Sequence, residues 1–478
     1  MNKTLRACLA IGLLVIPGLV LAQKPLTLDD AIAIAFERSL EVLLERNRLE
    51  EARTNFWAVQ LGQRPAVRLD LVLPAYAKTL NSYFDPLTGS ERFFSIGNTT
   101  LEGSLSISQP IALTNGQITF FGSLFGRNQI SEISGETRDY FSSAYIGLSQ
   151  PLFGFNDMKA AAQRAKIRLD QAERDHAQAR MDIIFSVTSN FYSLVKSKRS
   201  VEIMEERVVQ VERSYETAMN KFKAGLIAEV EAMELEVDLA LSRNELFNAR
   251  RGFEELKDDF RLFLGLDLDG PLDVTAELAF VPVQVTPEDA VRDLLDSRAD
   301  YQNAKSDIVL EGLSVREARA RNAIRASINA SYGINRNDDR FSGIFRNLLE
   351  SHRITLDLSV PIFDWGRNRK LVEQAKAGLQ LKEVQLQRME LAILRDVKSA
   401  LADLRSAEAR TKLLGRSVEV AQKSFDIKTE RFANGAITSF ELSQAQLKLT
   451  ETKLSVMNAL IDYEIAKADL ARKTLKEY

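Results

Sequence analysis

The sequence is poor in the residues that build metal centres and disulfide scaffolds. Its 478 residues include one cysteine, Cys8, and two histidines, His176 and His352. Cys8 lies in the apolar N-terminal segment, so a disulfide-stapled fold is excluded. The two histidines belong to no cluster with metal-ligand spacing. The chain also lacks a phosphate-binding glycine loop, a zinc motif and a nucleophile elbow. We therefore expect no cofactor, no metal and no enzymatic activity.

The chain also lacks an excess of one charge and, after residue 22, any long apolar run. Its 63 basic and 66 acidic residues leave no basic surface for nucleic acid. No later stretch is long and apolar enough for a membrane-spanning helix. At the N-terminus, Lys3 and Arg6 precede an apolar segment that ends at Ala22. We interpret residues 1–22 as a secretory signal peptide cleaved after Ala22; the alternative is an uncleaved anchor.

Proline and glycine are absent from Asn156 to Phe222, a stretch of 67 residues. Apolar or small residues recur there at alternating spacings of three and four, which predicts a helix packed along its whole length. At ~1.5 Å per residue, such a helix is about 100 Å long. A second helical pattern follows Gly225 and ends near Leu264. The chain therefore contains a very long helical hairpin, which no compact domain needs.

From Pro65 to Gln150 the apolar period changes from helical to two. The segment 81–100 is rich in turn-forming residues and is predicted to be a loop, and Asn115-Gly116 predicts a tight turn. The predicted strands have one apolar and one small-polar face. They fit a soluble sheet on a core, or a membrane β-barrel with lipid outside and a wet lumen inside. The signal peptide and the missing spanning helix favour the barrel. The strand-like segments are 67–73, 101–108, 118–125 and 141–150.

The second half of the chain repeats the first. Segment 360–366 repeats 150–156, and the helix turn 432–437 repeats 222–227, both 210 positions later. The helix start at 286–290 instead follows its counterpart at 27–31 by 259 positions, and the first of these helices is expected to continue toward Leu61. The first half therefore holds about 49 extra residues in its β region, which either add a strand pair or fold back outside.

These features together resemble the TolC-like outer-membrane efflux family over essentially the whole mature chain. The resemblance rests on the signal peptide, the two repeats, the Pro-x-Phe after each strand, and Phe-x-x-Gly-x-Ile at each helix turn. It implies a mainly α fold with a membrane β-barrel portion, in which two tandem repeats form part of a trimeric α-barrel and β-barrel tube. The implied function is a passive exit duct of a tripartite efflux or type I secretion system. The implied location is the outer membrane of a Gram-negative bacterium.

The resemblance also implies partners: a homotrimer, outer-membrane lipid, a periplasmic adaptor (membrane-fusion) protein and an inner-membrane transporter, with no nucleic acid. The alternative is a periplasmic coiled-coil adaptor or scaffold without a barrel. The expected segments are a signal peptide (1–22), a periplasmic helix (23–64), outer-membrane strands and loops (65–150), the first hairpin (151–264), an equatorial linker (265–285), a second periplasmic helix (286–325), further outer-membrane strands (326–361), and the second hairpin with a C-terminal equatorial segment (362–478).

By the same resemblance, three groups of residues form candidate sites. The sequence departs from the family pattern at two positions near the pore entrance. Gln444 stands where relatives have an acidic residue, and Ile437 stands where relatives have a basic residue that holds the entrance closed. The adaptor-docking tips are Ala224, Gly225, Leu226, Asn434, Gly435 and Ala436. A pore-entrance acidic ring is expected from Glu231, Glu234 and Glu441. The strand-to-helix junctions are Pro151, Phe153, Pro361 and Phe363.

Overall fold

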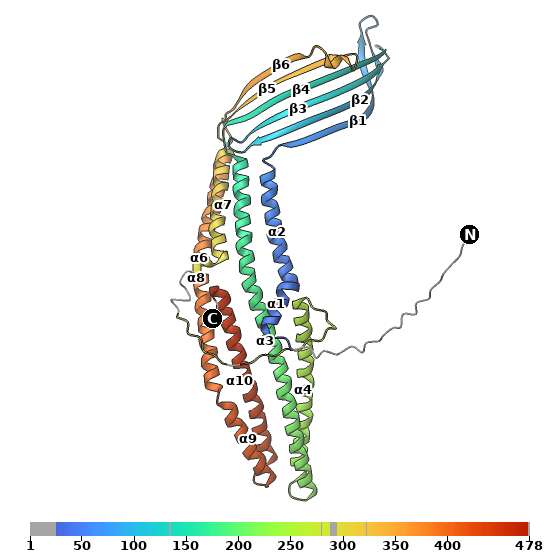
Figure 1. Cartoon of the computed structure of the whole chain (residues 1–478). Helices are drawn as coiled ribbons and strands as arrows, with labels where there is room; N and C mark the ends of the chain where they lie inside the picture. The colour runs from blue at the N-terminus through green and yellow to red at the C-terminus, as the bar shows by residue number, and fades with distance from the viewer. Residues whose placement is uncertain (1–24, 133–134, 279, 287–293, 322, 477–478) are drawn as a thin grey trace, which may run out of the picture.

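The computed structural model describes residues 25–132, 135–278, 280–286, 294–321 and 323–476. The expected signal peptide and the repeated helix start at 287–290 lie outside these ranges. A β-sheet occupies one end of the molecule, and long helices run away from it to two tips at the other end (Figure 1). In the described part of the chain, no helix combines the length and the apolarity needed to cross a membrane.

The helices and strands follow the order that the repeats predict. The helices are α1 (Leu28–Arg38), α2 (Leu40–Leu61), α3 (Asp157–Lys223), α4 (Glu229–Leu264), α6 (Leu294–Ser297), α7 (Ala299–Arg321), α8 (Arg367–Leu414), α9 (Ser417–Ala433) and α10 (Ser439–Thr474). The strands are β1 (Ala66–Asp85), β2 (Ser90–Ile111), β3 (Gly116–Ser131), β4 (Gly135–Phe153), β5 (Arg325–Asp338) and β6 (Leu349–Ser359), with a short 3-10 helix, η1 (Gly343–Phe345).

The long unbroken helix expected from the missing proline and glycine is present. α3 has 67 residues and extends from the sheet to the tip (Figure 1). The expected single helix from Thr27 toward Leu61 is wrong in one respect, because Ser39 divides it into α1 and α2. The backbone of Ser39 is extended, and its hydroxyl accepts a hydrogen bond from the amide of Glu41 at 3.3 Å. A serine that caps the following helix in this way ends the preceding one.

The six strands of the described residues form one antiparallel sheet in sequence order. The prediction of a loop over 81–100 is wrong, since β1 continues to Asp85 and β2 starts at Ser90. The two strands pair up to the contact of Asp85 with Ser90, and the left-handed Gly89 lies in the short turn between them. Cross-strand pairing therefore outweighs the local turn preference of this segment.

The register separates an apolar from a polar sheet face. One row of neighbours crosses the strands as Val67, Ile107, Phe120, Ile146 and Tyr332. Another row, displaced by an odd number of residues, runs through Asp70, Ser104, Ser123, Ser143 and Asn335. Many apolar side chains remain exposed, and Ile354 on β6 is 80% exposed. A folded chain that leaves such a face uncovered places it against lipid or a partner.

The main helical core lies about halfway along the molecule, where α1, α3, α4 and α10 meet. Phe191 and Phe260 are buried there with ring centroids 6.3 Å apart. Gly265 ends α4 in a left-handed conformation, and a Cβ at this position would lie 2.5 Å from the carbonyl oxygen of Arg38. Glycine is therefore required both for the backbone angle and for the close approach of α1. Leu26 and Val274 form a bridge that draws the segment after α4 to the same place.

One acidic side chain of α10, Glu464, lies half-buried in this helical region. Burial raises the pKa of Glu464 because the carboxylate loses water, and the charge of Lys467 opposes this shift. Burial, with a smaller contribution from the negative charge of Glu464, raises the pKa of Tyr192 to about 12. Ionisation of Glu464 is therefore less favourable in the folded protein than in the unfolded chain.

Candidate functional site

Each helical hairpin ends in a turn built around a glycine. Gly225 and Gly435 have φ of 73° and 75°, the left-handed region that glycine adopts without strain. The amide of Gly225 donates to the carbonyl of Phe222 at 2.8 Å, and that of Gly435 donates to Phe432 at 3.0 Å. A Cβ at either glycine would meet no atom within 4 Å. The turns therefore need glycine for the backbone and leave open space around it.

The other residues of the repeated Phe-x-x-Gly-x-Ile motif join the two tips. Phe222, Ile227 and Ile437 pack, partly buried, against a core that contains the buried Phe432. The Lys221 ammonium donates to the carbonyl of Phe432 and lies 4.5 Å from the centroid of its ring. The buried members of this core are Ala218, Ala232, Leu235, Phe425, Phe432, Leu442, Ala445 and Leu449. The motif is thus a packing motif that makes the ends of the hairpins one unit.

The three predicted acids lie close together at this unit, but their partners differ. Glu231 accepts a hydrogen bond from the amide of Ser439 at 3.4 Å, and Glu234 accepts from the hydroxyl of Ser439 at 2.9 Å. Glu441 instead accepts from the amide of Thr438, whose hydroxyl accepts from the amide of Glu441 at 3.4 Å. This reciprocal pair is a capping box at the start of α10. Two acids therefore link the hairpins and the third caps a helix.

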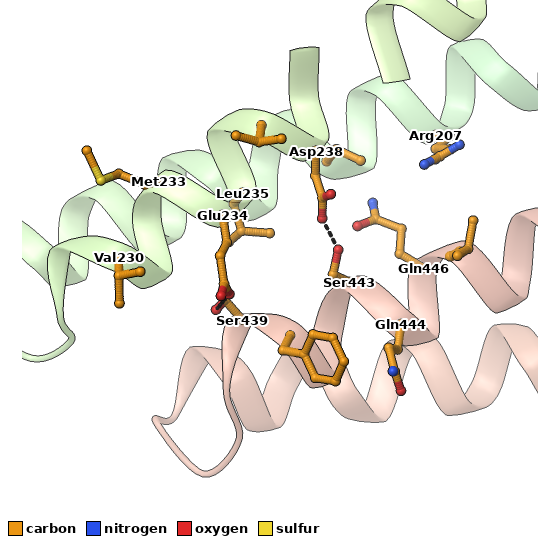
Figure 2. A pocket seen from close by; sticks show the side chains of 14 residues that line it. Arg207, Val230, Met233, Glu234, Leu235, Asp238, Ser439, Ser443, Gln444 and Gln446 are labelled. Atoms are coloured by element: carbon orange, nitrogen blue, oxygen red, sulfur yellow. Dashed lines mark hydrogen bonds between the residues drawn. The ribbon is translucent and has the colours of Figure 1, made fainter. Parts of the chain in front are cut away.

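One further link of this kind was not predicted from the sequence. The Ser443 hydroxyl donates to the carboxylate of Asp238, one step further along the same two helices (Figure 2). Glu231, Glu234 and Asp238 are spaced by three and four, so they share one face of α4. Ser439 and Ser443 share a face of α10 for the same reason. The sequence therefore shows which residues share a face of each helix, although not that the two faces meet.

A groove of about 640 Å³ lies beside these links, between α4 and α10 (Figure 2). Its apolar lining includes the exposed side chains of Val230, Met233, Val237 and Phe440. Gln446 also lines it and is 2% exposed, and its amide nitrogen has no partner among the described residues. The groove thus offers an apolar surface with a few polar groups, which suits a helix of another protein or copy.

The junction residues differ between the repeats. β4 continues through Pro151 to Phe153, with a register shift between them, which is where a strand tolerates proline. β6 ends at Ser359, before Pro361. The rings of Phe363 and Trp365 are 4.8 Å apart and exposed, and Phe153 is exposed as well. Exposed aromatic rings at the end of an apolar sheet are typical of a membrane boundary.

Asn156 connects the sheet to the helices at the first junction. Its side-chain oxygen accepts from the amide of Lys159 at 2.8 Å, which caps α3. Its side-chain nitrogen donates to the carbonyls of Ala112 and Leu113, in the turn between β2 and β3, at 2.8 and 3.1 Å. This turn also contains Asn115, at the position predicted from the sequence. One side chain thus binds the sheet turn and the helix start together.

An antiparallel sheet that exposes an apolar face and is joined to long helical hairpins is the fold of an outer-membrane channel. The structure is similar to the Campylobacter jejuni CmeC outer membrane channel, with a TM-score of 0.70, 14% identity and coverage of 94% of this chain and 85% of that one. Nodulation protein T of Rhizobium leguminosarum bv. trifolii is 23% identical over 354 residues, 71% of this chain and 74% of that protein. Outer membrane protein TolC of Vibrio cholerae is 20% identical over 338 residues, 67% of this chain and 74% of that protein.

The family described as outer membrane efflux protein matches residues 122–255 and 290–474, and the chain belongs to this family. It is a non-enzymatic channel of the Gram-negative outer membrane that extends into the periplasm and serves efflux or type I secretion. The predicted family, mainly helical fold, function and location are confirmed. The alternative of a periplasmic scaffold without a barrel is wrong.

Proposed function

We propose that three copies of this chain form one passive exit duct, in which the sheets join into a barrel and the helices into a periplasmic tube. The observation that carries the proposal is the six-stranded sheet, which has an exposed apolar face and is not closed within the described chain. Backbone groups in a bilayer must be paired, so a sheet in the membrane has to close. A single set of six strands is too few for a barrel around a channel, and additional copies complete it.

The two tips are the proposed docking site for a periplasmic adaptor protein, which connects the duct to an inner-membrane transporter. They lie at the end of the molecule furthest from the sheet (Figure 1). Leu226 is 73% exposed beside Gly225, and the space around both turn glycines is open. Ala224, Asn434 and Ala436 complete this surface. A partner can therefore approach both turns without displacing any part of the chain.

Glu231, Glu234 and Glu441 are the proposed acidic ring at the periplasmic entrance. Three copies of these carboxylates around one axis would concentrate cations and repel anions. The hydrogen bonds from Ser439 hold two of the acids in position, which supports a defined ring. Gln444 contributes no charge, so the first repeat supplies more of the ring than the second.

The docking proposal is tested with tryptophan at the turn glycines. Gly225→Trp and Gly435→Trp place a large side chain in the open space and strain the left-handed turn. We expect each variant to lose most adaptor co-purification and efflux while still inserting into the outer membrane. Gly252→Trp is the matched control, because this glycine of α4 also has no atom within 4 Å of an added Cβ but lies far from the tip. Normal adaptor binding by both tip variants would contradict the docking role.

A further inference from the structure

β4 and β6 lead into the equivalent segments 150–156 and 360–366, so β3 and β4 correspond to β5 and β6. The extra residues of the first repeat therefore lie in the hairpin of β1 and β2, which continues the sheet. β2 pairs with β3 from Ile96–Ser131 to Ile111–Gly116 without a register shift. β1 pairs with β2 along its length, with one irregularity between Val72 and Ala75. Of the two alternatives left open by the sequence, the described residues therefore show an added strand pair in the same sheet as β3 to β6.

This arrangement leaves β3 without a free edge. Its two neighbours are β2 and β4, so among the described strands only β1 and β6 have an unpaired side. Neighbouring strands alternate in direction, and the sheet has an even number of them, so β1 and β6 run in opposite directions. When β6 of one copy lies beside β1 of the next, the antiparallel ladder continues without a break.

The side chains of the two edge strands match for this pairing. Val67, Leu69 and Leu71 of β1 lie on the apolar face, and all three are exposed. The register puts Ile354, Leu356 and Leu358 of β6, also exposed, on the same face. The opposite face carries charges of both signs on both strands: Arg68 and Asp70 on β1, and Arg353 and Asp357 on β6. Aligning the apolar rows therefore also brings mixed charges together on the lumen side.

We propose that this chain closes an eighteen-stranded barrel, six strands from each of three chains, through pairing of β1 with β6 of the next copy. The proposal rests on the proposed trimer. Among the described residues, the second repeat supplies β5 and β6 alone, so without the extra hairpin each chain would supply four strands. Barrel diameter grows roughly in proportion to strand number, so the hairpin widens the barrel about 1.5-fold and its cross-section about twofold.

The pairing is tested by disulfide cross-linking, for which the chain is suited because its only native cysteine is Cys8. Leu69→Cys is combined in turn with Ile354→Cys, Leu356→Cys or Leu358→Cys, which covers three registers of the aligned apolar rows. The control combines Phe120→Cys of β3 with the same three partners. Two strands lie between β3 and the neighbouring β6 in the proposed barrel, so the control cysteines are about 14 Å apart, beyond disulfide reach.

We expect at least one Leu69 pair to give at least tenfold more covalently linked trimer in oxidised membranes than any Phe120 pair. Linkage through Phe120 instead would show that the hairpin lies outside the barrel, which overturns the inference and leaves the trimer intact. Electron microscopy of the unaltered protein gives an independent result. A trimeric barrel of eighteen strands supports the inference. A trimeric barrel of twelve strands overturns the inference but leaves the proposed trimeric duct intact. A protein that is not trimeric overturns the proposed duct as well.

Discussion

The two hairpin tips have the same fold but use the same glutamate differently. Glu231 and Glu441 are equivalent in the two repeats, 210 positions apart. The residue that caps the following helix is Ala228 in the first repeat and Thr438 in the second. Thr438 holds Glu441 in a capping box, whereas Ala228 has no side-chain oxygen and leaves Glu231 available for Ser439. The threonine hydroxyl, present in one repeat and absent from the other, thus distinguishes a local cap from a link between hairpins.

The repeats also differ in continuity. α3 passes from the sheet to its tip without interruption, whereas the equivalent arm of the second repeat is divided at Gly415 and Arg416 into α8 and α9. Glycine in a helix interior costs about 1 kcal/mol relative to alanine, so the helix is weakest at this point. Duplication has therefore kept the order of elements while the stiffness of the two arms diverged.

The largest expected difference between the repeats concerns the motif phenylalanines. Phe432 is 2% exposed, and Phe222 is only partly buried against the same core. Phe432→Ala should reduce the free energy of unfolding of the helices by about 3–5 kcal/mol, and Phe222→Ala by clearly less, because less apolar surface is lost. Thermal unfolding followed by circular dichroism measures both. Equal losses would mean that the two tips contribute equally to the shared core.

An intermediate effect is expected from exchanging the cap residues. Thr438→Ala removes the capping box and should destabilise the start of α10 by about 1 kcal/mol. Ala228→Thr should stabilise the start of α4 by a similar amount and draw Glu231 from Ser439 into a new capping box. Hydrogen exchange at the amides of α4 and α10 reports both changes. If Ala228→Thr leaves Ser439 amide protection unchanged, the comparison between the repeats is wrong.

The smallest effect is a pH dependence that distinguishes Glu464 from its equivalent in the first repeat, Glu254. Glu254 is exposed and pairs with Lys257 at 3.0 Å. Burial raises the pKa of Glu464, so its ionisation lowers the stability of the folded state as the pH rises above about 4.5 and through the raised pKa. Glu464→Gln should therefore raise the melting temperature at about pH 8 and change it little at about pH 4.

The matched control for this prediction is Glu254→Gln. The Glu254 side chain is exposed, so its replacement should change the melting temperature by at most the small contribution of an exposed ion pair. A pH-independent effect of Glu464→Gln would show that its carboxylate remains well solvated in the assembled protein.

The sequence predicted the features that depend on period and on residue absence. The length of α3 followed from the missing proline and glycine, and the two sheet faces followed from alternation at residues such as Leu69 and Asp70. The β1–β2 hairpin beyond residue 80 was missed, because cross-strand contacts hold residues that locally favour turns. The link between Asp238 and Ser443 was missed because it joins residues 205 positions apart. No local pattern specifies how two helices face each other.

The junction at Asn156 couples the orientation of the long helix α3 directly to that of the sheet. The Asn156 side chain is hydrogen-bonded to the turn between β2 and β3 and also caps α3. No flexible linker therefore separates the sheet from the first residue of the helix. Gly225 lies at the other end of a helix of 67 residues, about 100 Å away. A tilt of about one degree at the base therefore moves the tip sideways by about 2 Å. Small changes of strand tilt in the membrane and the spacing of the periplasmic tips are thus geometrically coupled.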